Sequence, residues 1–126
     1  MNQRLIRASL LAVLLTTGCA VGYQARGSLG DVPGELQGKA FPGSAGGGRF
    51  VLAERTGRVQ CDGQMSPPDT SPFPGSCAGE TGRGVVRCSD GRNIPVRWTA
   101  ITCRSFEGSG EDSAGNRLVF RVDRSK

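Results

Sequence analysis

The sequence predicts a small all-β protein: an antiparallel β-meander, or a partly open barrel or sandwich, stapled by disulfides and with Gly-rich turns. Three observations support this fold class. Apolar and polar residues alternate along several short segments, which is the period of a half-buried strand. Glycine occupies 20 of the 126 positions, and together with proline it interrupts every long segment that could form a helix. Five cysteines in so short a chain are typical of an oxidising compartment.

The expected strands all lie after residue 48. Between two of them, residues 89–92 contain an Asp-Gly pair, which is typical of a two-stranded hairpin turn. Pro95 lacks a backbone donor, so we expect its strand to be an edge strand or to begin there. The predicted strands are 49–54, 59–61, 84–88, 94–99, 101–106 and 116–122.

The chain divides into three parts. Residues 1–18 begin with a positive segment and continue with a short apolar stretch, which is typical of a signal peptide and too short to span a bilayer. Residues 19–34 are interrupted by glycine and proline and show no sustained period, so we expect a flexible tether. Residues 35–126 are expected to form one small β domain. Within it, residues 62–76 hold four of the chain's seven prolines and predict a surface loop.

The end of the first part, residues 15–19 (LTTGC), resembles a lipobox, the signature of bacterial lipoprotein precursors. The resemblance implies that Cys19 receives a diacylglyceryl group, that cleavage precedes it, and that the new amine is acylated with a fatty acid such as palmitate. Two or more acyl chains hold a protein stably on a membrane. Ala20, and not Asp, follows the cysteine, which in this family favours the outer membrane, facing the periplasm. Thr16 stands where the family prefers Leu, and ordinary cleavage after Ala20 would instead remove Cys19.

Four further cysteines form an even set, for which three disulfide pairings are open. We favour Cys61–Cys77 with Cys88–Cys103, because the first bridge would close the Pro-rich loop. The alternative is Cys61–Cys88 with Cys77–Cys103, which would join neighbouring hairpins. Because no pair has Cys-x-x-Cys spacing and the chain lacks histidine, we expect no metal site and no cofactor.

The chain offers binding residues more readily than catalytic ones. Without histidine it lacks the commonest general base, so we do not expect an enzyme. If Arg87, Arg97 and Arg121 share a sheet face, that face is a candidate contact for an envelope protein, for anionic lipid or for an acidic glycan. Trp98, the single tryptophan, is expected in the core, with ligand stacking as a second role. Acidic residues interleave with these arginines, and we expect no nucleic-acid partner.

Two weaker patterns occur in the β domain. Gly-x-Gly segments at 46–48, 82–84 and 108–110 are similar to MORN-type hairpin repeats, although their spacing is irregular. Glycine at the bulges and turns of any meander explains them equally well. The acidic residues Glu107, Glu111 and Asp112 match no calcium loop, so they predict a polar turn.

The sequence therefore predicts a lipoprotein of the bacterial cell envelope, whose small β domain acts in structural or binding interactions. The alternative is a periplasmic inhibitor of a secreted hydrolase such as lysozyme. Membrane-bound lysozyme inhibitors are similarly small, disulfide-bonded and lipid-anchored. Their inhibitory loop has a Ser-x-Ser-Gly-x-(Arg/Lys)-Tyr pattern, of which residues 112–118 keep only Gly115 and Arg117.

Overall fold

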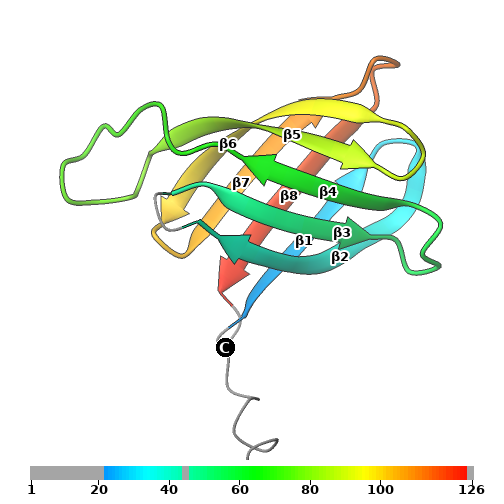
Figure 1. The fold of residues 1–126 in the computed structure, drawn as a ribbon, viewed down its shortest axis with the longest axis horizontal. Helices are drawn as coiled ribbons and strands as arrows, with labels where there is room; N and C mark the ends of the chain where they lie inside the picture. The colour runs from blue at the N-terminus through cyan, green and yellow to red at the C-terminus, as the bar shows by residue number, and fades with distance from the viewer. Residues whose placement is uncertain (1–21, 44–45, 125–126) are drawn as a thin grey trace, which may run out of the picture.

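The computed structural model describes residues 22–43 and 46–124, and the regular structure within them is entirely β. Eight antiparallel strands follow one another around a closed barrel, because the last strand pairs with the first (Figure 1). The predicted all-β, disulfide-bonded fold class is confirmed, and its architecture is a barrel. The strands are β1 (Tyr23–Leu29), β2 (Val32–Pro42), β3 (Gly48–Ala53), β4 (Gln60–Met65), β5 (Thr81–Cys88), β6 (Asn93–Thr102), β7 (Ser105–Glu111) and β8 (Arg117–Arg124).

The two ends of the barrel differ in their connections. One end, here the hairpin end, carries the short turns that follow β1, β3, β5 and β7. The other end, here the termini end, carries the start of β1, the end of β8, the turns after β2 and β6, and the β4–β5 loop of residues 66–80. In Figure 1 the turns of the hairpin end lie at the right and top, and the long loop lies at the left.

Side chains fill the barrel interior. Along β6 every second residue from Ile94 to Ala100 is buried, and β8 follows the same alternation, as a closed barrel requires of its inward positions. Phe50 and Phe120 stack across the interior with their ring centroids 4.6 Å apart. The core is therefore a packed layer of side chains from all eight strands.

Three interior glycines make room for three large aromatic rings. Each glycine lies opposite its ring in the strand ladder, and a Cβ atom in its place would enter the ring. The pairs are Gly63 with Phe50, Gly82 with Trp98, and Gly108 with Phe120. Packing against aromatic rings therefore accounts for the first glycine in two of the three Gly-x-Gly segments.

The turn predicted at residues 89–92 is present at the hairpin end. Gly91 has a φ of 92°, a conformation that side chains rarely adopt, and its N–H donates to the carbonyl of Cys88 at 3.0 Å. Gly115, with a φ of 83°, has the equivalent role in the turn between β7 and β8. Local turn chemistry thus fixes both hairpins, as the sequence indicated for the first of them.

The predicted tether is wrong for most of its length. Residues 23–29 form β1 and residues 32–34 begin β2, while residues 19–21 lie outside the described part of the chain. Gly27 does not break β1, because close approach to β8 requires it: a Cβ there would clash with the carbonyl oxygen of Val119. Pro33 and Gly34 fall where the β1–β2 register shifts, so neither interrupts a regular ladder. The barrel therefore begins at Tyr23.

Several strand boundaries also differ from prediction. The expected strand 101–106 spans the turn between β6 and β7, and the acidic segment 107–112 is mostly strand β7 and not a turn. Strand β4 runs to Met65, into the expected loop. Pro95 is not at an edge, because the barrel is closed, but pairing between β6 and β7 starts only at Val96. Because Pro95 lies outside the β6–β7 pairing, its missing backbone N–H removes no hydrogen bond from that ladder.

The preferred disulfide pairing is wrong, and the alternative is correct. Cys61 bonds to Cys88, which lies directly opposite it in the β4–β5 ladder, and Cys77 bonds to Cys103. Strand β4 carries Cys61 near the hairpin end, whereas the loop carries Cys77 at the termini end. A bridge between those two cysteines would have to cross the length of β4. The loop is instead fastened to the β6–β7 turn.

Candidate functional site

The three predicted arginines face outward, but they do not form one basic patch. Arg87 pairs with Asn93 in the β5–β6 ladder, whereas Arg97 lies further along β6, opposite Arg83. Arg121 lies on β8 and donates from Nε to Asp123 at 2.9 Å. The three side chains belong to different rows of the sheet, so none of them is directly paired with another.

Trp98 is a core residue. Its side chain points into the barrel over Gly82, and only 6% of the residue is exposed. It contacts Phe106 with ring centroids 6.1 Å apart. The predicted place of Trp98 in the core is confirmed.

A row of outward side chains, charged except for Val51, crosses the outer face of β2 to β5. Lys39 on β2 pairs with Val51 on β3, Val51 pairs with Asp62 on β4, and Asp62 pairs with Arg87 on β5. Directly paired outward side chains of a sheet lie close enough to interact. Of this row only Arg87 was singled out from the sequence, because the pairing of four strands is needed to identify the others.

A second row of outward side chains lies next to the first and adds further polar groups. Two shallow hollows lie over the two rows. Arg49, Gln64 and Val85 pair in succession across β3, β4 and β5. A hollow of about 450 Å³ lies over β4 and β5, and a second of about 650 Å³ lies over β2 to β5. Both include Asp62 and Arg87 in their walls, and we call them together the outer hollow.

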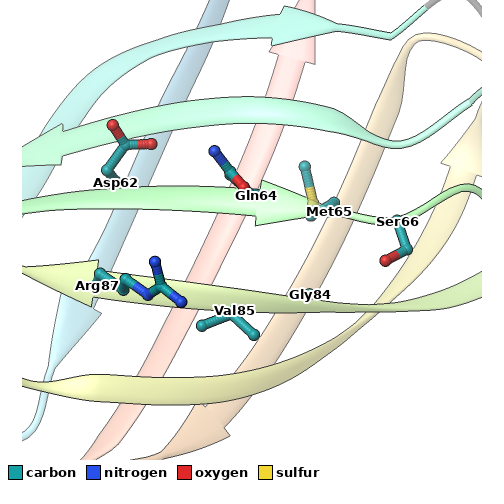
Figure 2. Close-up of a pocket in the computed structure, with 7 residues that line it drawn as sticks. All are labelled: Asp62, Gln64, Met65, Ser66, Gly84, Val85 and Arg87. Atoms are coloured by element: carbon teal, nitrogen blue, oxygen red, sulfur yellow. The ribbon is translucent and has the colours of Figure 1, made fainter.

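The outer hollow exposes one guanidinium in particular. Figure 2 shows the Arg87 side chain extending over β5 toward Gln64 and Val85, while the Asp62 carboxylate points away from it. Gly84 lines the same hollow, and a Cβ atom in its place would lie 2.7 Å from the backbone oxygen of Gln64. An exposed planar guanidinium is suited to bidentate contact with a carboxylate or phosphate.

Asp62 points away because it is paired with Arg49. Arg49 donates from Nη2 to one carboxylate oxygen at 2.6 Å and from Nε to the other at 2.9 Å. These hydrogen bonds lower the pKa of Asp62 and raise that of Arg49. One positive charge is thus neutralised within the hollow, and Lys39 and Arg87 give it a net positive character.

Another charged cluster, at the hairpin end, joins three turns. Arg92 in the β5–β6 turn forms ion pairs with Asp31, with Asp90 at 2.8 Å and with Asp112 at 3.3 Å. Hydrogen bonding to Asp31 is the largest cause of a raised pKa for Arg92, and it lowers the pKa of Asp31. Asp112 also accepts hydrogen bonds from Asn116, which lower its pKa. The cluster holds the turns together, and sequence reasoning missed it because the three acids are far apart in the chain.

The described residues contain no group of three or more histidine, cysteine, aspartate or glutamate side chains placed to hold a metal ion. Within residues 22–43 and 46–124 no helix has the length and apolar character required to cross a bilayer. Comparisons of the chain with protein-family models, curated proteins and solved structures yield no match.

Proposed function

We propose that this chain is a lipoprotein of the bacterial cell envelope, held by lipid on Cys19 on the outer membrane and facing the periplasm, and that its barrel is a binding module. The observation that carries the proposal concerns the cysteines. Of the five in the chain, four pair with one another as Cys61–Cys88 and Cys77–Cys103. Cys19 therefore has no partner thiol within the chain, and it stands at the end of the lipobox-like segment.

The binding surface we propose is the outer hollow. The interior of the barrel is occupied by side chains, so a ligand would meet the outside. Arg87 and Lys39 supply positive charge, and Val85 adds exposed apolar surface beside them. This combination favours an acidic group of an envelope partner, held by charge-assisted hydrogen bonds.

The titratable groups support binding over catalysis. General acid–base catalysis requires a group that titrates near the working pH. Hydrogen bonds and ion pairs lower the pKa of three carboxylates, which keeps them ionised. They are Asp31, Asp62 and Asp112. The inhibitor-type pattern at residues 112–118 gives little support to the hydrolase-inhibitor alternative. Asp112 accepts a hydrogen bond from the Ala114 N–H within the β7–β8 turn, and Gly115 has a positive φ in the same turn.

Lipidation is tested by the N-terminal peptide of the full-length protein from a bacterial membrane fraction. We expect mass spectrometry to find a triacylated Cys19, and the Cys19→Ala variant to be absent from that fraction. An unmodified mature chain that starts at Val21 would contradict the anchor. A soluble chain of that kind that inhibits lysozyme would establish the alternative.

Binding is tested by photo-cross-linking in intact cells. A cross-linkable residue at Gln64, in the outer hollow, should yield an adduct that the same residue at Val119, on the outer face of β8, does not yield. The adduct should be lost in Arg87→Glu and kept in Arg97→Glu, the matched exposed arginine outside the hollow. Equal adducts in both arginine variants would refute the assignment of the surface.

A further inference from the structure

Exposed apolar side chains are distributed unequally between the two ends of the barrel. Among the described residues, five large hydrophobic side chains are exposed, and three of them lie at the termini end. Phe41 near the end of β2 is 52% exposed, Phe73 in the β4–β5 loop is 59% exposed, and Ile101 near the end of β6 is 37% exposed. The other two lie on the barrel wall, and none lies in the turns of the hairpin end.

The most exposed of these rings is held in place by its loop. The disulfide Cys77–Cys103 ties the loop to the β6–β7 turn, and the Gly79 N–H donates to the carbonyl of Ala100 at 2.9 Å. Phe73 packs over Gly79, where a Cβ atom would lie 3.5 Å from the ring. A ring that is already positioned loses less conformational freedom when a surface covers it.

Basic side chains accompany the apolar ones. Arg104 in the β6–β7 turn and Arg124 at the end of β8 are both exposed. The Arg124 N–H donates to the carbonyl of Arg104 at 3.2 Å, so the two residues are neighbours. Exposed aromatic side chains and arginines at the same end of a protein are the composition that suits the interface of a bilayer with anionic headgroups.

The length of chain between the lipid and the barrel selects the end that meets the membrane. Only three residues separate Cys19 from Tyr23, the first residue of β1 at the termini end. Fully extended, the chain from Cys19 to Tyr23 reaches at most about 14 Å. A lipid on Cys19 would therefore hold the termini end against the bilayer and leave the hairpin end distant from it.

We propose that the termini end of the barrel rests on the bilayer, with Phe41, Phe73 and Ile101 in the interfacial region and Arg104 and Arg124 against lipid phosphates. This proposal rests on the lipid anchor proposed above. It makes the protein a membrane-seated module of fixed orientation. The turns joined by Arg92 then point away from the membrane, and the outer hollow faces sideways along it.

The orientation is tested with the full-length protein reconstituted into vesicles of equal parts phosphatidylcholine and phosphatidylglycerol with brominated acyl chains, which quench nearby tryptophan. A tryptophan is introduced by Phe73→Trp at the termini end or by Arg58→Trp in the exposed β3–β4 turn of the hairpin end. The signal of buried Trp98 is common to both variants and is subtracted. Mass spectrometry of each preparation reports the state of Cys19, and near-ultraviolet circular dichroism reports folding.

We expect the Phe73→Trp emission to shift to shorter wavelength and lose most of its intensity, and the Arg58→Trp emission to remain unchanged. If Cys19 carries lipid and the two tryptophans are quenched equally, or neither is quenched, the orientation is wrong while the anchor stands. If Cys19 is unmodified, the anchor and the orientation are both wrong.

Discussion

Adding a single methyl group at Gly82 should destabilise the barrel, because the space that the methyl needs is filled by Trp98. A Cβ at Gly82 would lie 2.5 Å from two carbons of the indole, Cε2 and Cζ2. Ordinary carbon–carbon contact is about 3.5–4.0 Å, so the overlap is roughly 1 Å or more. Trp98 is 6% exposed and packed in the core, so displacing the ring would disturb its neighbours.

The cost follows from that overlap. Overpacking a core typically costs about 1–3 kcal/mol, and the lower entropy of unfolded alanine offsets about 0.4–1 kcal/mol of it. We therefore expect Gly82→Ala to lose roughly 1–2 kcal/mol. For a domain of this size that corresponds to a fall in Tm of roughly 5–15 °C.

The assay is thermal unfolding followed by circular dichroism, with both disulfides intact. Trp98 is the only tryptophan, so its fluorescence reports directly whether the ring is displaced. Gly30→Ala is the matched control: a Cβ there would lie 3.4 Å from its nearest atom, the backbone nitrogen of Arg117, and Gly30 is not among the glycines with positive φ. In a double-mutant cycle, Trp98→Phe should relieve part of the cost of Gly82→Ala.

The reasoning is refuted if Gly82→Ala melts within error of Gly30→Ala, or if the double variant loses the full sum of the two single effects. The first result would mean that the indole moves away at no cost, and the second that the cost of Gly82→Ala does not come from contact with the indole. The glycine would then be present for another reason than the volume of the ring.

Two further predictions concern the disulfide and the charged cluster. The Cys61–Cys88 disulfide joins residues with a sequence separation of 27, so its removal should lower the free energy of unfolding by about 3.5 kcal/mol by the chain-entropy relation. The measurement is urea unfolding of the Cys61→Ala/Cys88→Ala variant. A decrease of less than about 1 kcal/mol would contradict the prediction. The lowered pKa of Asp31 and Asp112 means that their ionised forms stabilise the barrel above about pH 4, and this stabilisation is lost as the pH falls through the lowered values. Arg92→Met should therefore lower the free energy of unfolding most at neutral pH. The difference in free energy of unfolding between the variant and the unsubstituted protein should shrink below about pH 4. Unfolding measured across the acid range rules this out if that difference stays constant.

How far the candidate site could be predicted depended on the distance between its members in the chain. Arg87 was identifiable because an isolated arginine in a strand pattern is visible locally. Its companions Lys39 and Asp62 belong to other strands, and only the register of β2 to β5 aligns them. The same holds for Arg92 and Asp31, which are sixty-one residues apart in the chain and meet at the hairpin end.

The glycines of the N-terminal segment illustrate the opposite error. Gly27 and Gly34 predicted a tether because glycine is a local signal for a break in structure. In the barrel Gly27 is instead the residue that lets β1 approach β8 closely, and Gly34 lies where the β1–β2 register shifts. Whether a glycine ends a strand or permits close packing depends on a neighbour that is distant in sequence.

By itself the sequence determined the all-β class, the hairpin turn at Gly91 and the even set of four cysteines, because alternation, turn chemistry and cysteine number are local properties. Only the tertiary structure decided that the barrel closes, that β1 and β2 belong to it, and that Cys61 pairs with Cys88. Closure and pairing depend on which strands become neighbours. That choice is made by burying one face of every strand in a common core, which no single segment specifies.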